Sequence, residues 1–96
     1  MTNQTTAISY AVSPQAVPSF HDEGMVILHA GNGRLFTSNE TGARIWRGIE
    51  RQLSLESIAG EISGAYQITR TTAREHTLGF LRALEQQALI RIEVAS

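Results

Sequence analysis

Few side chains in this 96-residue chain have the types and spacing that catalysis or metal binding needs. His21, Asp22 and Glu23 are adjacent in a polar segment, where neighbouring side chains diverge, and Glu75 and His76 are likewise adjacent on an expected helix. No two His residues have the i, i+4 spacing of a helical zinc site, and the chain has no Cys for a thiolate. We therefore expect no catalytic residue, no metal and no cofactor, and a protein that is not an enzyme.

A second set of side chains suits binding instead. Arg34, Leu35, Phe36 and Thr37 form the return strand of an expected hairpin, which becomes a sheet edge if an N-terminal strand pairs on the other side. An exposed edge offers unpaired amides and carbonyls, to which an extended peptide can add as a strand. The outward flank of the last expected helix contributes Arg74, Leu78, Arg82 and Glu85 at helical spacing, with Leu81 at its border.

This combination suits a peptide with apolar anchors and one or two acidic residues. We expect pockets beside Leu35, Leu78 and Leu81 to hold the apolar residues, and Arg74 and Arg82 to pair with carboxylates. Because Leu78 lies outside the main apolar stripe, an isolated surface leucine is the alternative interpretation of that residue.

The hydrophobic pattern predicts the elements that position these residues. Residues 7–12 alternate weakly and are an expected first strand, followed by a proline-containing loop at 13–19. Residues 25–30 are aliphatic and β-branched, and with 34–37 they predict a β-hairpin around the turn 31–33. That turn leads into a strand rather than a helix, which excludes a phosphate-binding loop.

After residue 38 the apolar residues recur at helical spacing. Asn39 is a good N-cap for a helix over about 40–52, which carries the only Trp, Trp46, on the face turned to the strands. Ser54 caps a second helix, and Thr69 or Thr72 caps a third. Residues 89–94 alternate and are an expected short last strand. The prediction is one α+β domain over 1–96, winged-helix-like, with a three-stranded antiparallel sheet followed by three helices and a frayed segment at 1–6.

Such a fold also allows a winged-helix DNA-binding regulator, with the third helix in a major groove. Its first turns offer Arg70 and Arg74, with Thr69, Thr71 and Thr72 for phosphates. Against this, the net charge is -1 and all eight basic residues are Arg, so the chain lacks a basic footprint. No signal peptide or membrane span is visible, and we expect a cytoplasmic protein that binds neither nucleic acid nor membrane.

The segment 39–46, Asn-Glu-Thr-Gly-Ala-Arg-Ile-Trp, follows a strand that contains Gly-Arg-Leu-Phe at 33–36. Together with 54–59 and 80–84, in this order and spacing, it resembles the PqqD-like family over about 25–92. The resemblance implies a leader-peptide recognition element of ribosomal peptide modification pathways, which binds a leader as an added strand against the third helix. It implies no catalysis, and as partners a leader peptidase and a cyclase in the lasso-peptide type or a radical SAM enzyme in the PQQ type.

Three positions depart from the family pattern. Ser38 stands where the family often has Leu, His76 where it often has an acidic residue, and Ala88 where it often has Gly. These departures leave the leader sequence undetermined. The lasso-peptide type is slightly favoured over the PQQ type, and we expect a monomer, with a swapped dimer through the loop before residue 25 as the alternative.

Overall fold

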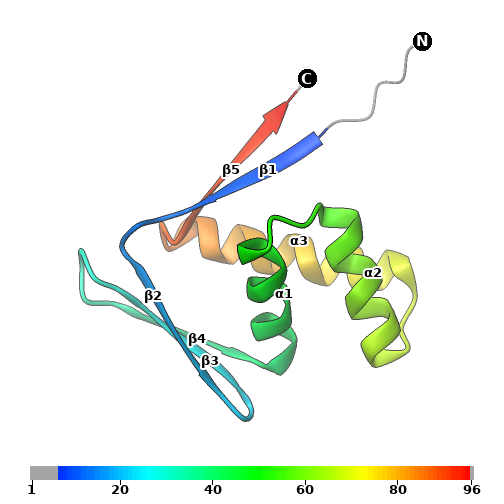
Figure 1. Cartoon of the computed structure of the whole chain (residues 1–96), viewed down its shortest axis with the longest axis horizontal. Coiled ribbons are helices and arrows are strands. Elements are labelled where there is room, and N and C mark those ends of the chain that lie inside the picture. Colours follow the sequence, from blue (N-terminus) through cyan, green and yellow to red (C-terminus); the bar gives the residue numbers. More distant parts are fainter. Residues whose placement is uncertain (1–6, 96) are drawn as a thin grey trace.

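The computed structural model describes residues 7–95, and the expected frayed segment 1–6 lies outside them. Two antiparallel sheets flank a group of helices (Figure 1). In chain order the elements are β1 (Ala7–Val12), β2 (Ala16–His21), β3 (Gly24–His29), β4 (Leu35–Asn39), α1 (Glu40–Glu50), α2 (Leu55–Tyr66), α3 (Arg70–Gln86) and β5 (Ile90–Ala95). None of the helices in this part of the chain is long and apolar enough to cross a membrane. The expected α+β class is confirmed.

The three-stranded sheet has the order β2-β3-β4, with β3 in the centre. Ile27 of β3 pairs with Phe36 on one side and with Pro18 on the other. The predicted hairpin is therefore present, and the expected condition for an exposed edge is met, because a strand pairs on the far side of β3. β4 runs two residues further than predicted, so that Asn39 both ends the strand and caps α1.

The partner of β3 is not the strand we expected. Residues 13–19 were predicted to form a loop and a hinge, but Ala16–His21 is β2. Its Pro18 lies in an edge strand. Ala30 N–H donates to Gln15 O at 2.8 Å, and hydrogen-bonded pairs alternate with non-hydrogen-bonded pairs along antiparallel strands. The pair of Pro18 with Ile27 therefore forms no ladder hydrogen bond. The side chains of β2 alternate between part-buried and exposed, as is typical of a strand. Pro14 and Pro18 led us to predict a loop instead.

The first predicted strand exists as β1, but it pairs with β5 rather than with the hairpin. Tyr10 lies opposite Ile92, and Val12 lies opposite Ile90. The resulting two-stranded ribbon extends along one side of the helices, and the larger sheet lies on another (Figure 1). The short last strand was predicted correctly, and its long-range partner was not.

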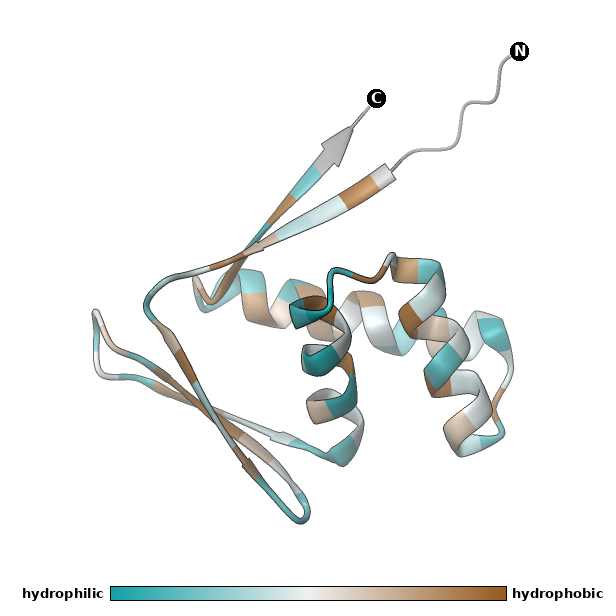
Figure 2. Ribbon diagram, viewed as in Figure 1, coloured by the Kyte–Doolittle hydropathy of each residue, from teal (hydrophilic) through white to brown (hydrophobic). Residues whose placement is uncertain are grey.

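The core lies between β3 and the three helices. Trp46, fully buried, is its largest side chain and packs from α1, as predicted. The fully or almost fully buried residues around it are Met25, Ile27, Ile45, Ile49, Ile58, Ile62, Leu81, Leu84 and Leu89. Gly48 brings α1 close to α2, because a Cβ on Gly48 would lie 2.8 Å from Ile58 Cγ1. In Figure 2 the apolar segments alternate with polar ones along the strands and helices, as such a half-covered arrangement requires.

Candidate peptide-binding groove

The outer edge of β4 has no partner strand among the described residues. At the hairpin end, His29 N–H donates to Arg34 O at 2.8 Å. Because antiparallel pairs alternate, Phe36 directs its backbone groups to β3, whereas Leu35 and Thr37 direct theirs to the free edge. These N–H and C=O groups can form backbone hydrogen bonds with an added strand.

An open groove of about 550 Å³ runs beside this edge, between the start of α1 and α3. Its lining residues are Asn39, Thr41, Gly42, Ile45, Glu75, His76, Gly79, Phe80 and Ala83. Gly42, Gly79 and Ala83 have little or no side chain, which keeps the groove hollow. Phe80 and Ile45 make its floor apolar, and Glu75 and His76 form a polar rim.

The local sequence forces the chain to turn at this groove. The side-chain Oδ1 of Asn39 accepts from Gly42 N–H at 3.0 Å and caps α1, so strand and helix meet without an intervening loop. A Cβ on Gly42 would lie 2.7 Å from both Phe80 Cε1 and Ser38 Cβ. The glycine therefore allows the first turn of α1 to approach β4 and α3 at the same time.

The strand residues predicted for the site are arranged as expected. Leu35, 66% exposed, and Thr37 are on the outer face of the sheet, whereas Phe36 is part-buried on the inner face. Arg34 precedes the strand and is exposed. None of the four lines the groove itself; β4 contributes Asn39 to the lining, and Phe36 contacts the groove residue Phe80.

The predicted flank of α3 is corrected by the structure. Leu81 has no exposed surface and belongs to the core stripe, so it cannot line a surface pocket. Arg74 faces α2, where its Nε lies 2.7 Å from Glu56 Oε2. Leu78 is part-buried against the core, and Arg82 and Glu85 are exposed outside the groove lining.

The physical reason is a rotation of the helix about its axis. Sequence periodicity finds the apolar stripe of α3 but not which border of that stripe faces α2 and which faces β4. The groove lies on the other border, at Glu75, His76, Gly79, Phe80 and Ala83. Two small residues four positions apart, Gly79 and Ala83, were the available signal for a hollow on this side.

The arginine residues predicted to contact DNA do not form an outward basic surface. Arg70 lies against α2, with its Nη2 3.2 Å from the point where a Cβ on Gly60 would stand. Arg74 is paired with Glu56, as described above. The first turn of α3 thus directs both guanidinium groups to α2 rather than outward as a basic surface. In the part of the chain that the structure describes, no three His, Cys, Asp or Glu residues are grouped to hold a metal ion.

Comparison with known proteins identifies the family and the fold of this chain. Residues 24–90 match the model of the family described as Coenzyme PQQ synthesis protein D (PqqD). The solved structure of TbiB1 in complex with the TbiA(beta) leader peptide has a TM-score of 0.78 and 31% sequence identity, covering 84% of this chain and 94% of that one. A lasso peptide synthetase B1 complexed with the leader peptide has a TM-score of 0.80 over 86% of this chain and 98% of that one, and at 22% identity it shows the fold alone. No curated protein sequence gives a significant match.

Proposed function

Because the chain belongs to the PqqD family, we propose that it is a non-catalytic adaptor that binds the leader peptide of a ribosomally made precursor. The observation that carries this proposal is that the free edge of β4 lies beside an apolar groove on α3. TbiB1, which is 31% identical and covered over 94% of its length, was solved with a leader peptide. This likeness supports the lasso-peptide type over the PQQ type.

In the proposed complex the leader adds to the sheet beside β4. Leu35 and Thr37 each supply one N–H donor and one C=O acceptor to the peptide backbone, and each such bond contributes on the order of 1 kcal/mol. Since side chains alternate along a strand, every second leader residue turns inward to the groove and meets Phe80, Gly79 and Ala83. The backbone bonds set the register, and the groove selects apolar side chains.

The charged residues near the groove refine this selection. Glu75 and His76 stand at the rim and favour polar leader residues there. Arg34, beside the edge strand, and Arg82, on the exposed side of α3, are the cations that a leader carboxylate reaches from this edge. Arg74 has no part in this arrangement, because Glu56 holds it against α2.

The adaptor presents the bound leader to a second protein that carries out the chemistry. In the lasso-peptide type this is a leader peptidase with a cyclase, and in the PQQ type a radical SAM enzyme. The proposed role is non-catalytic. Of the candidate acid–base residues, His21 and Asp22 lie at the β2–β3 turn, and His76 lies on α3.

An amide chemical-shift titration with a panel of leader peptides, including the TbiA(beta) leader, tests the proposal. A random DNA duplex serves as the alternative ligand. We expect leader-induced shifts at 35–39 and at His76, Gly79, Phe80 and Ala83. Shifts produced by DNA alone, at the first turn of α3, would instead indicate a winged-helix regulator.

A further inference from the structure

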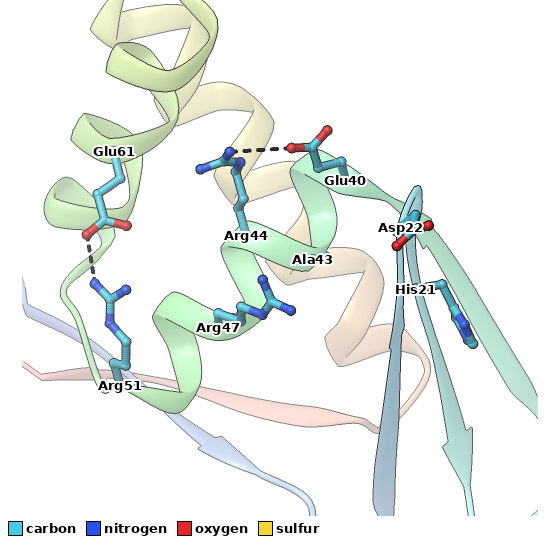
Figure 3. Close-up of a pocket in the computed structure, with 9 residues that line it drawn as sticks. His21, Asp22, Glu40, Ala43, Arg44, Arg47, Arg51 and Glu61 are labelled. Carbon is cyan, nitrogen blue, oxygen red and sulfur yellow. Dashed lines mark hydrogen bonds and ion pairs between the residues drawn. The ribbon is translucent and has the colours of Figure 1, made fainter.

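A second cleft lies on the opposite side of α1 from the groove (Figure 3). It has a volume of about 320 Å³ and is bounded by the β2–β3 turn at His21 and Asp22, by α1, and by Glu61 of α2. Ile45 faces the groove, and Arg47 faces the cleft. Residues two positions apart in an α-helix point about 160° away from each other around its axis. A ligand in the cleft therefore leaves the groove accessible.

Three guanidinium groups line one side of this cleft. Arg44, Arg47 and Arg51 recur at i, i+3 and i+7, so they project from the same face of α1 (Figure 3). Hydrophilic residues recur on successive turns of the same helix in Figure 2. The proposed leader complex makes no use of this row.

Two of the three are already neutralised within the chain. Arg44 Nη2 lies 3.3 Å from Glu40 Oε2, and Arg51 Nη2 lies 2.7 Å from Glu61 Oε2. The pKa of Arg44 is raised by its contacts with Tyr66 and, to a lesser degree, with Glu40. Both Arg residues consequently offset two of the three carboxylates that line the cleft, and Asp22 is the third.

Arg47 differs, because it forms no ion pair with a carboxylate in the part of the chain that the structure describes. Its guanidinium carbon lies 4.3 Å from the centroid of the Phe20 ring, stacked over an aromatic side chain of β2. Stacking holds the planar group in place while leaving the N–H groups on its edge unused. A fixed guanidinium with unused donors suits bidentate recognition of a carboxylate.

The remaining charges limit what the cleft accepts. Asp22 lines the cleft across from α1, and His21 lies beside it. A polyanion would meet Asp22, Glu40 and Glu61 as well as Arg47. The balance of charges thus favours a single carboxylate over a nucleic acid backbone or a dense acidic tract.

We propose that this cleft, with Arg47 at its centre, binds an Asp or Glu side chain of the processing enzyme to which the leader is presented. The proposal rests on the adaptor function, since an adaptor must hold its enzyme and its leader at the same time. A surface on the other side of α1 meets that requirement. The carboxylate enters between the β2–β3 turn and α1 and accepts two hydrogen bonds from Arg47.

The first test needs no knowledge of the enzyme. A blocked Gly-Glu-Gly tripeptide is titrated into the labelled chain, with the matched Gly-Gln-Gly tripeptide and inorganic phosphate as comparisons, while the arginine Nε–H signals are observed. We expect a saturable shift of the Arg47 signal with the Glu tripeptide only. This shift should persist when a leader occupies the groove. In Arg47→Gln, which lacks the arginine signal, the Glu tripeptide should no longer shift the backbone amides of the residues that line the cleft. Equal shifts at Arg91, a larger response to phosphate, or no response at Arg47 would overturn the proposal.

The second test assigns the carboxylate to the enzyme. The leader-bound chain is tested for binding to the purified leader peptidase that processes its precursor. Arg47→Gln should weaken this complex about tenfold, Arg47→Lys should weaken it less, and Arg91→Gln on β5 should leave it unchanged. Peptidase binding by Arg47→Gln equal to that of the parent would overturn the assignment.

Leader affinity separates this proposal from the adaptor function. Arg47→Gln should bind the leader as the parent does. If the substitution lowers the affinity for the leader, a carboxylate of the leader occupies the cleft, and the assignment to the enzyme is wrong. If the parent binds no leader, the adaptor function fails, but the tripeptide titration still decides whether the cleft recognises a carboxylate.

Discussion

Phe36 of β4 and Phe80 of α3 meet edge to face, with ring centroids 5.8 Å apart and an angle of 67° between the ring planes. This contact joins the edge strand to the helix on the far side of the groove. Because Phe80 also lines the groove, the separation between strand and helix depends on the same side chain that a bound peptide would contact. Fold and binding surface are therefore coupled at this pair.

A double-mutant cycle measures that coupling. Replacing Phe36 and Phe80 by Leu, singly and together, should give a coupling free energy of about 0.5–1.5 kcal/mol, since edge-to-face pairs add this much beyond buried area. Urea unfolding followed by the fluorescence of the buried Trp46 gives the four free energies. Additive losses would mean that the two rings contribute independently.

Filling the groove should abolish peptide binding without harm to the fold. A Cβ on Gly79 would meet no atom within 4 Å, so Gly79→Leu is tolerated, and replacing a helical glycine stabilises α3 by up to about 1 kcal/mol. The added side chain occupies the hollow and should lower leader affinity more than about tenfold, a cost above 1.4 kcal/mol.

Gly64 on α2 provides a matched control for this variant. A Cβ there also meets no atom within 4 Å, and Gly64 is not among the groove-lining residues. Gly64→Leu should raise the free energy of unfolding in the same way and leave leader affinity unchanged. Titration calorimetry with the leader, together with urea unfolding, compares the two. A Gly79→Leu variant that binds normally would place the peptide elsewhere.

A proline at Thr37 tests strand addition directly. Thr37 directs its N–H to the free edge, so Thr37→Pro removes a donor to the peptide but none to β3. Pro18 already occupies a comparable outward position on β2. We expect folding to be retained and leader affinity to fall by about tenfold or more, measured by calorimetry. Ser38→Pro, which removes a donor to Met25, should instead destabilise the sheet.

The two arginine residues first assigned to the peptide should differ in effect. Arg82→Glu places a negative charge on the exposed side of α3 and should weaken binding of a leader that carries a carboxylate. Arg74→Glu faces Glu56 and should lower the free energy of unfolding slightly, by up to about 1 kcal/mol, with little change in affinity. Fluorescence anisotropy with a labelled leader separates the two. Equal effects on binding would restore Arg74 to the site.

Replacing Ala88 by Gly should stabilise the fold, whereas most substitutions in a protein destabilise it. Its φ is +59°, a left-handed conformation that costs an L-residue about 1–2 kcal/mol. Ala88→Gly removes this cost, in part offset by the greater freedom of glycine in the unfolded chain, and should stabilise the fold by about 0.5–1 kcal/mol. Thermal and urea unfolding measure the gain. Gln87→Gly, at a residue with φ of -90°, is the matched control and should not stabilise.

Apart from β2, the local elements of this protein were determined by the sequence, because each depends on residues close in the chain. The capping side chain of Asn39, the helical spacing that buries Trp46, and the hairpin before them required no tertiary information. The exposed edge of β4 was predicted only on the condition that an N-terminal strand pairs on the far side of the hairpin. The strand that does so is β2, in a segment predicted as a loop.

Only the tertiary structure decided which surfaces meet. The pairing of β1 with β5 joins the two ends of the chain and depends on where α3 delivers the last strand. The face of α3 that borders the groove depends on how that helix packs against α2. This packing turns Arg74 toward α2, so the candidate site includes His76 and Gly79 instead of Arg74 and Leu78. Periodicity fixes the buried stripe of a helix, but its two borders are equivalent until neighbouring elements occupy one of them.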